Sequence, residues 1–183
     1  MPYEPPPELA LLSLNEIAKL VADRKLPPVN EWHPEKSGDS EMRIAADGRW
    51  FHQGGEIRRP AMVRAFSSLL RRDADSCFWL VTPHERLSIE VEDAPFIAVE
   101  LRSEGSEDQR ELAFRLNSDD LVIADADHGL EFRPLPYVHV RDGLWAKIAR
   151  PVYYELAELA LAENNHPLGL WSKGSFFPIE QDA

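Results

Sequence analysis

Apolar residues recur along this chain in three patterns, and the first predicts a helix near the N-terminus. Between residues 9 and 24 the apolar positions follow helical spacing: Leu9, Leu12, Ile17, Leu20 and Val21. Ser13 and Glu16 have the spacing of a capping box, in which each side chain bonds the backbone N–H of the other residue. Because Pro27-Pro28 cannot continue a helix, we expect it to end before them.

The second pattern is a hairpin that runs into a helix. Asp47-Gly48 separates Ile44 from Trp50-Phe51-His52, and it favours a type I′ turn because glycine takes positive φ without strain. Arg59-Pro60 follows, and proline is favoured at the first helical position. The helix is expected to carry one apolar stripe and to end on two arginines: Met62, Val63, Phe66, Leu69, Leu70, then Arg71-Arg72.

This hairpin–helix pattern occurs a second time. Asp142-Gly143 and Trp145 repeat Asp47-Gly48 and Trp50 after 95 residues, and Arg150-Pro151 repeats Arg59-Pro60 after 91, so the second hairpin is four residues shorter. The second helix has its own apolar stripe and an expected left-handed cap: Val152, Leu156, Leu159, Ala160, then Asn164-Asn165. Three features in one order indicate a duplication, with convergent hairpin chemistry as the alternative.

The third pattern is a series of short β-type runs: 78–82, 87–92, 96–102, 112–117, 121–126 and 137–141. Together the patterns predict an α+β fold of tandem strand–hairpin–helix units, whose C-terminal half is a mostly antiparallel sheet closed by one helix. We place the leading helix and first repeat in an N-terminal α+β domain, residues 1–82. The β domain with the second repeat and closing helix covers residues 83–183.

Composition narrows the compartment and the partners. The formal net charge of −12 disfavours nucleic acids and anionic membranes as partners. Cys77 is the single cysteine, and neither a signal-like N-terminus nor an apolar run of membrane-spanning length is apparent. We therefore expect a cytoplasmic protein.

The charge is unevenly distributed. Residues 42–72 hold seven arginines against Asp47 and Glu56, whereas residues 85–131 hold 14 acidic residues against four arginines. Either the two halves attract each other, or the basic segment contributes to an anion site.

Catalytic and metal signatures are lacking. The six histidines have no metal-ligand spacing, Cys77 leads into an apolar strand, and no Gly-rich phosphate loop or nucleophile elbow occurs. We expect no cofactor, no metal and no catalytic group, and we leave open whether the protein is an enzyme.

Several segments carry candidate binding groups. Thr82-Pro83-His84-Glu85 fits a capped helical turn, whose free N–H groups could instead hold an anion. Asp93 precedes an apolar bend and could bond its backbone or a ligand. Two strand faces combine aromatic rings with polar groups: one carries Trp50 and His52, and the other carries Tyr137, His139 and Arg141. Such faces are typical of half-buried packing, but they also occur in sites for planar, phosphate-bearing ligands.

Linked motifs across residues 28–177 resemble a bacterial family catalogued as domain of unknown function 1285. They are Trp32-His-Pro34, Asp39 to Ile44, Asp47 to His52, Ile57-x-Arg59, Met62 to Ser67, Leu80 to Glu85, Val91 to Phe96, Pro136 to Arg141, Arg150 to Glu155 and Trp171 to Phe177. The segment 38–41 and His84 depart from the family pattern. The resemblance implies a duplicated core, a C-terminal half loosely like a pleckstrin-homology fold, a nucleotide-like ligand between the halves and a role in signalling.

Our leading hypothesis is a ligand-binding or regulatory protein for a small anionic, nucleotide-like molecule held between its halves. The expected ligand-binding residues are Arg43, Trp50, His52, Arg59, Arg64, Thr82, Glu85, Asp93, Tyr137 and Arg141. Of these Arg59 is the weakest, since Arg150 repeats it. The alternatives are a protein-interaction adaptor, using either the face of Arg64, Ser67 and Arg71 or a free sheet edge, and an enzyme with Glu85 or Asp93 as general base.

Overall fold

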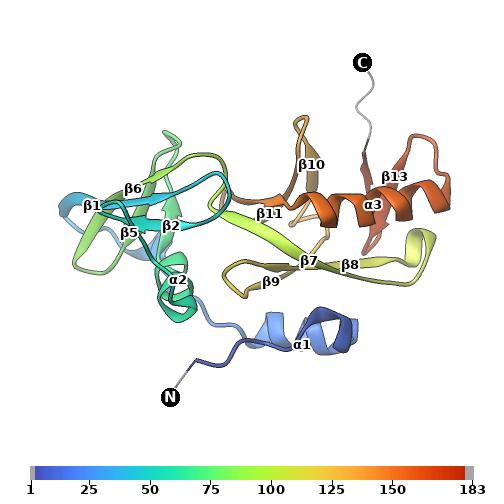
Figure 1. Ribbon diagram of the computed structural model, residues 1–183, viewed down its shortest axis with the longest axis horizontal. Coiled ribbons are helices and arrows are strands. Elements are labelled where there is room, and N and C mark those ends of the chain that lie inside the picture. Colours follow the sequence, from blue (N-terminus) through green and yellow to red (C-terminus); the bar gives the residue numbers. More distant parts are fainter. Residues whose placement is uncertain (1–2, 180–183) are drawn as a thin grey trace.

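The computed structural model describes residues 3–179 and has two six-stranded sheets, a separate hairpin and three α-helices (Figure 1). Residues 1–2 and 180–183, the outer ends of both expected domains, lie outside this description. The helices are α1 (Leu14–Asp23), α2 (Pro60–Ser67) and α3 (Arg150–Glu163), with 3₁₀ turns at Leu9–Leu11, Val29–Glu31 and Glu107–Gln109. The fold is therefore mixed α+β, as the sequence predicts.

The first sheet has the order β3-β2-β1-β6-β5-β4. Its strands are β1 (Lys36–Ile44), β2 (Trp50–His52), β3 (Gly55–Glu56), β4 (Leu70–Arg72), β5 (Phe78–Val81) and β6 (Glu85–Val91). Neighbours are antiparallel except at the centre, where β1 runs parallel to β6 with Ile44 opposite Val91.

The second sheet has the order β10-β11-β12-β7-β8-β9 and also contains one parallel pair, β12 with β7. Its strands are β7 (Phe96–Glu104), β8 (Glu111–Leu116), β9 (Leu121–Ile123), β10 (Leu130–Phe132), β11 (Pro136–Arg141) and β12 (Leu144–Ile148). The aromatic C-terminal segment forms a hairpin of β13 (Gly169–Ser172) and β14 (Ser175–Pro178).

Strand β8 is buried on both faces. Leu112, Phe114 and Leu116 lie in the main core together with residues of α3, whereas Ala113 belongs to a second cluster with Leu14 and Ile17 of α1, so the strand's alternating side chains meet different helices. Figure 1 shows α1 and α3 on opposite sides of this region. The leading helix therefore packs on the second sheet, not on the first repeat with which the sequence grouped it.

The boundary expected between residues 82 and 83 lies inside the first sheet. It falls in the turn between β5 and β6, which pair antiparallel with Leu80 opposite Leu87. The two sheets instead divide at residues 92–95, between β6 and β7. The bend expected after Asp93 was the local sign of this division, but β6 carries the same alternating pattern as the strands that follow it and was therefore grouped with them.

The two Asp-Gly turns are different. Asp142 and Gly143 both have positive φ (45° and 77°), as the expected type I′ turn requires. In the first copy only Gly48 does (φ 88°), and the backbone bonds from Gly48 N to Ala45 O and from Ala45 N to Arg49 O close a longer loop. The type I′ expectation is wrong there. The four-residue difference between the repeats arises after this loop, between Trp50 and Arg59, where the first copy contains the additional strand β3.

Helix ends show where local patterns hold and where they fail. The capping box of Ser13 and Glu16 is present, and Asn164 ends α3 in the left-handed conformation. The first repeat helix, however, stops at Ser67, and Leu70 and the two arginines form strand β4, paired with β5. The expected Thr82–Glu85 helical turn is instead the β5–β6 hairpin turn, in which the Thr82 hydroxyl accepts bonds from the backbone N–H groups of His84 and Glu85.

One apolar core runs through both sheets. It contains Ile44 and Trp50 from the first half and Phe96 and Phe114 from the second, each no more than 2% exposed. A hydrogen bond also joins the two halves directly. The Asn117 amide of the second half donates to Gly48 O of the first half (3.1 Å), and it accepts from Ile97 N of its own half (3.0 Å).

This contact makes Gly48 sensitive to any side chain. A Cβ at Gly48 would lie 2.5 Å from Ile97 Cγ1 and 2.8 Å from Asn117 Nδ2, in a backbone of φ 88°. We expect Gly48→Ala to lower the free energy of unfolding in urea by about 2–4 kcal/mol, from overpacking and left-handed strain. Gly54→Ala is the control, because Gly54 has a similar φ of 82° and nothing within 4 Å, so only the strain of about 1 kcal/mol should remain. Equal losses for the two variants would contradict the close contact.

Candidate functional site

The ten residues expected to bind a ligand do not form one site. Arg64 and Arg141 lie at the contact between the halves, Asp93 and Tyr137 line a pocket there, and His52, Thr82 and Glu85 line another pocket within the first half. The other three are separate: Arg43, Trp50 and Arg59.

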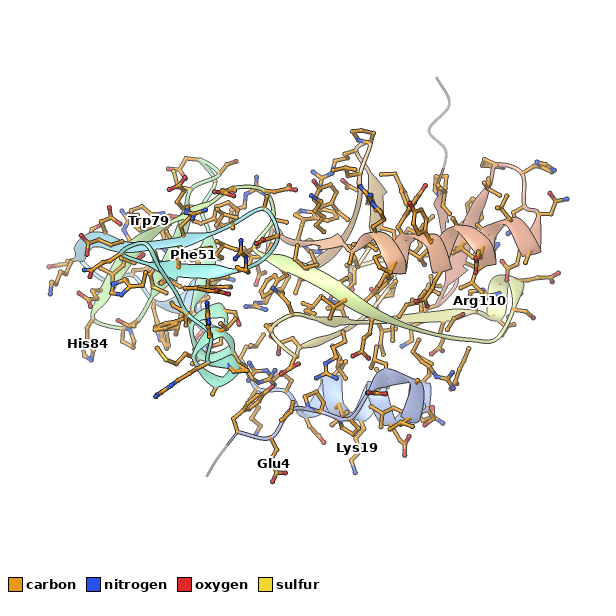
Figure 2. All side chains as sticks on the ribbon, in the orientation of Figure 1. Glu4, Lys19, Phe51, Trp79, His84 and Arg110 are labelled. Atoms are coloured by element: carbon orange, nitrogen blue, oxygen red, sulfur yellow. The ribbon has the colours of Figure 1, made fainter. Side chains whose placement is uncertain are left out.

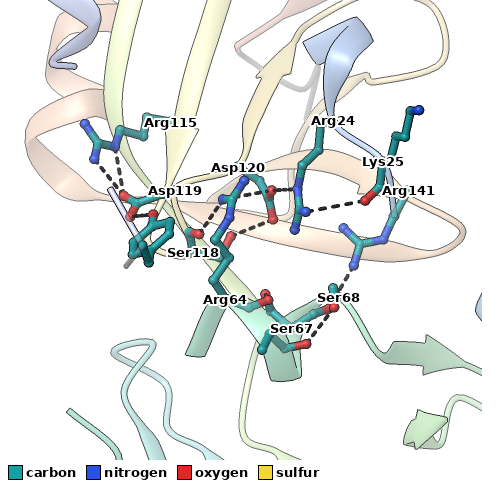
Figure 3. A network of polar contacts seen from close by, with 12 residues as sticks. Arg24, Lys25, Arg64, Ser67, Ser68, Arg115, Ser118, Asp119, Asp120 and Arg141 are labelled. Carbon is teal, nitrogen blue, oxygen red and sulfur yellow. Dashed lines mark hydrogen bonds and ion pairs between the residues drawn. The ribbon is translucent and has the colours of Figure 1, made fainter. Parts of the chain in front are cut away.

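Arg64 takes part in a polar network between the halves, drawn in Figure 3. It extends from α2 to the turn after β8, where it donates to Ser118 O (3.0 Å) and pairs with Asp120 (3.2 Å). Asp120 also pairs with Arg24 at 2.8 Å, at the C-terminus of α1, and its side chain is only 8% exposed. One carboxylate therefore joins α1, α2 and the second sheet.

The neighbouring Asp119 fixes the N-terminal segment in the same region. It pairs with Arg115 at 2.7 Å and accepts a hydrogen bond from the Tyr3 hydroxyl. Burial and then this bond raise the pKa of Tyr3 to about 12.

Arg141 holds the halves together from the other side. It donates to the carbonyl of Ser67, the last residue of α2 (2.9 Å), and its guanidinium lies 5.4 Å from the ring centre of Phe96. Burial lowers the pKa of Arg141, and the charge of Asp120 partly opposes that change. Ser67 itself is 1% exposed, and Arg71 lies on β4, where it contacts Val29, Trp32 and Asp73, so the three residues named for the adaptor hypothesis do not form one exposed face of α2.

Asp93 and Tyr137 line a pocket of about 270 Å³ between the halves. The first half contributes Arg72 and Phe78, the linker contributes Asp93 to Pro95, and the second half contributes Arg133, Tyr137, Gly143 and Trp145. We call this the interdomain pocket. It exists because β4 and the turn of the second Asp-Gly hairpin meet, where Arg72 donates to Gly143 O (3.0 Å).

Positive charge and aromatic rings coincide in the interdomain pocket. The guanidinium of Arg133 lies 4.6 Å from the ring centre of Trp145 and 5.0 Å from that of Tyr137, and that of Arg72 lies 5.5 Å from Phe78. Arg133 is 48% exposed and pairs with Glu131 through Nε. Such an arrangement can present N–H donors to an anion and ring faces to a planar group.

Asp93 is held inside this pocket by two partners. It accepts a hydrogen bond from the Tyr137 hydroxyl (2.8 Å) and pairs with Lys147 (3.1 Å). Burial, followed by the bond and charge of Asp93, raises the pKa of Tyr137. The carboxylate therefore orients the tyrosine ring and offsets part of the positive charge.

His52, Thr82 and Glu85 lie at a different pocket, of about 340 Å³, between α2 and the first sheet. We call it the apolar pocket, because its remaining lining is Ser40 and seven apolar side chains: Met42, Ile57, Met62, Phe66, Leu69, Leu80 and Leu87. Glu85 pairs with Lys36 at 3.2 Å, and its side chain is 35% exposed. This pocket shares no residue with the interdomain pocket.

The three remaining residues have separate surroundings. Trp50 is 2% exposed and stacks on Phe66 with ring centres 6.5 Å apart, which makes it a core residue. Arg43 pairs with Glu92 and lies over Phe51 at 4.6 Å. Arg59 is the exposed residue before α2 and lines none of the pockets described above.

Residues 27–94 match the N-terminal domain of a family described as "Domain of unknown function (DUF1285)", and residues 95–179 match its C-terminal domain, described as "Protein of unknown function (DUF1285)". The chain belongs to the DUF1285 family. The division between the two family domains coincides with the division between the two sheets.

Crystal structures of two other family members resemble this DUF1285 protein. One from Silicibacter pomeroyi DSS-3 is 43% identical, with a TM-score of 0.77 over 91% of this chain and 93% of that one. One from Shewanella baltica OS155 is 24% identical, with a TM-score of 0.50 over 68% of this chain and 96% of that one, and it shows shared fold alone. The comparison with curated proteins found no match.

Within residues 3–179 of this DUF1285 protein, no group of three or more His, Cys, Asp and Glu side chains is placed to hold a metal ion. No helix in the same range is long and apolar enough to cross a membrane.

Sequence reasoning missed the two arginines of the interdomain pocket. Arg72 was expected to end a helix, and Arg133 lies between β10 and β11 in a segment without any motif. The available signal was an aromatic residue on each strand of the second hairpin, Tyr137 on β11 and Trp145 on β12, with Arg133 in the loop just before β11.

The network around Asp120 predicts a large loss of stability when its carboxylate is removed. Asp120→Ala leaves Arg24 and Arg64 without their shared partner in a largely buried position, so we expect the free energy of unfolding to fall by about 3–5 kcal/mol. Glu56→Ala is the control, because Glu56 pairs with Arg58, whose side chain is 83% exposed, and should change stability by no more than about 1 kcal/mol. Chemical denaturation of both variants measures this, and similar small losses would show that the network contributes little.

Proposed function

We propose that this protein binds a small anionic molecule with a planar, nucleotide-like part in the interdomain pocket. The observation that carries the proposal is the presence of Arg72 and Arg133 in one pocket with the rings of Phe78, Tyr137 and Trp145. Arginine presents a planar fork of donors suited to phosphate and carboxylate groups, and it also stacks on ring faces.

The position between the halves supports a regulatory role for such binding. The pocket takes residues from both sheets and from their linker, so a ligand that contacts all three would bind best to one relative placement of the halves. We therefore propose a cytoplasmic regulatory protein, active in signal transduction, rather than a catalyst.

Neither candidate carboxylate supports a carboxylate-dependent enzyme. Asp93 in the interdomain pocket already has Tyr137 and Lys147 as partners, and Glu85 in the apolar pocket is paired with Lys36. A general base needs a carboxylate within reach of a substrate proton and with a pKa near the working pH. The adaptor alternative is weakened because Arg64 and Ser67 make internal contacts.

We propose that the second half, a mostly antiparallel sheet with α3 as its closing helix, is related in plan to the pleckstrin-homology domain. Fold likeness alone predicts no lipid binding, and the proposed ligand is a dissolved molecule.

Thermal denaturation with mononucleotides, cyclic nucleotides and inorganic pyrophosphate tests the proposed function. A ligand at about 100 times its dissociation constant should raise the melting temperature by roughly 5–10 °C. We expect Arg133→Ala to abolish most of this rise, because it removes both the charge and the stacking partner of Trp145.

The matched control is Arg58→Ala, which removes the same charge from an arginine that is 83% exposed and outside the pocket. It should leave the rise unchanged. If no anionic compound shifts the melting temperature, or if the shift survives in both Arg72→Ala and Arg133→Ala, the proposed function is wrong.

A further inference from the structure

The two repeats differ in the length of their helices, and the difference leaves part of the first sheet uncovered. Helix α3 has 14 residues and α2 has eight. Six residues fewer make α2 about 9 Å shorter. The chain leaves α2 at Ser67 and enters β4 at Leu70, so the helix covers only part of the sheet face beside it.

The uncovered face is the apolar pocket. Its floor is buried, since Met42 is 8% and Leu80 is 5% exposed, whereas Met62 at its margin is 40% exposed. Phe66 and Leu69 are half-buried in its wall. An apolar concavity of about 340 Å³ that stays in contact with water favours any apolar group that can fill it.

Most polar groups around this pocket already have partners. The Ser40 hydroxyl donates to Ser88 O (2.7 Å) and accepts from Met42 N (3.1 Å). The Thr82 hydroxyl is used within the hairpin turn. These two residues therefore shape the rim but offer a ligand little.

Two side chains remain to recognise a polar head. Within residues 3–179 the imidazole of His52 has no side-chain partner, and it is exposed at the rim. Glu85 is the only acidic residue lining the pocket, and no lysine or arginine lines it. Its partner Lys36 is 78% exposed, so displacing that ion pair costs little.

From this arrangement we propose that the apolar pocket binds a small amine, with its hydrocarbon part against Met42, Phe66 and Leu80 and its ammonium group at Glu85. An apolar cavity of about 150 Å³ holds benzene, so a pocket of about 340 Å³ has room for a hydrocarbon body of at least about six carbon atoms. The ammonium donates to the Glu85 carboxylate, and His52 accepts or donates at the rim. This site is additional to the proposed function, with which it shares no residue.

The methionines provide a direct test in the full-length protein. Two of the chain's three methionines, Met42 and Met62, line the pocket, so ¹³C-methyl labelling of methionine places NMR signals inside it. The probes are n-hexylamine, 1-hexanol and hexanoate, which share one hydrocarbon chain and differ in head group. We expect saturable shifts of both methyl signals, with hexylamine binding about five- to tenfold more tightly than hexanoate and hexanol between them.

The variant Glu85→Gln should lower hexylamine affinity about five- to tenfold and leave hexanol affinity unchanged. His84→Gln is the matched control, because His84 belongs to the same turn but points away from the body of the protein (Figure 2). It should bind all three probes like the parent. A retained preference for the amine in Glu85→Gln, equal affinity for hexanoate, or no saturable shift with any probe would overturn the proposal.

The variant Arg133→Ala tests whether hexylamine binds in the apolar pocket or in the interdomain pocket, because Arg133 lines only the latter. We expect it to bind hexylamine normally even if it loses every response to anionic compounds. Loss of hexylamine binding in Arg133→Ala, with Glu85→Gln unaffected, would assign the amine to the interdomain pocket and would also overturn the proposal.

Discussion

The placement of the two halves depends on the ion pairs of one buried carboxylate. Asp120 lies in the turn after β8, yet its partners come from the end of α1 and from α2, which are 96 and 56 residues earlier in the chain. Taking the charges of Asp120, Arg24 and Arg64 out of water is unfavourable unless each group gains ion pairs and hydrogen bonds of good geometry. In this structure Asp120 pairs with both arginines and so joins the leading helix, the first half and the second sheet, in the same arrangement that forms the interdomain pocket.

The duplication explains what the two halves share and where they diverge. Both copies keep an Asp-Gly hairpin, a tryptophan and an Arg-Pro that opens a helix, but the surroundings of the tryptophans differ. Trp50 is enclosed in the core beside Phe66, whereas Trp145 lies half-buried at the interdomain pocket with Arg133 above it. The same position thus supports the core in one copy and contributes to a candidate site in the other.

Local rules predicted the elements, and long-range pairing decided their partners. The capping box at Ser13, the left-handed Asn164 and the second Asp-Gly turn depend on a few adjacent residues, and all three were predictable. Strand β4 was not, because Leu70 continues a helical pattern and becomes a strand only through its pairing with Leu80. Only part of the candidate site was predictable. Tyr137 and Asp93 were both nominated from the sequence, and they are joined by a hydrogen bond. Arg72 and Arg133 line the same pocket through long-range contacts that no local spacing encodes.

The packing of α1 against the second sheet has a consequence for how the chain is made. Its apolar face, including Leu14 and Ile17, is complete once Asp23 has been synthesised, yet it packs with Ile123 of β9, whose strand begins at Leu121, 98 residues later. At the usual rates of translation that interval lasts roughly 5–20 s. During it the first sheet, which lies entirely before residue 92, has time to form, while α1 waits with an uncovered apolar surface. Helix α1 is thus synthesised long before its partner strand, and the nascent chain must remain soluble throughout that delay.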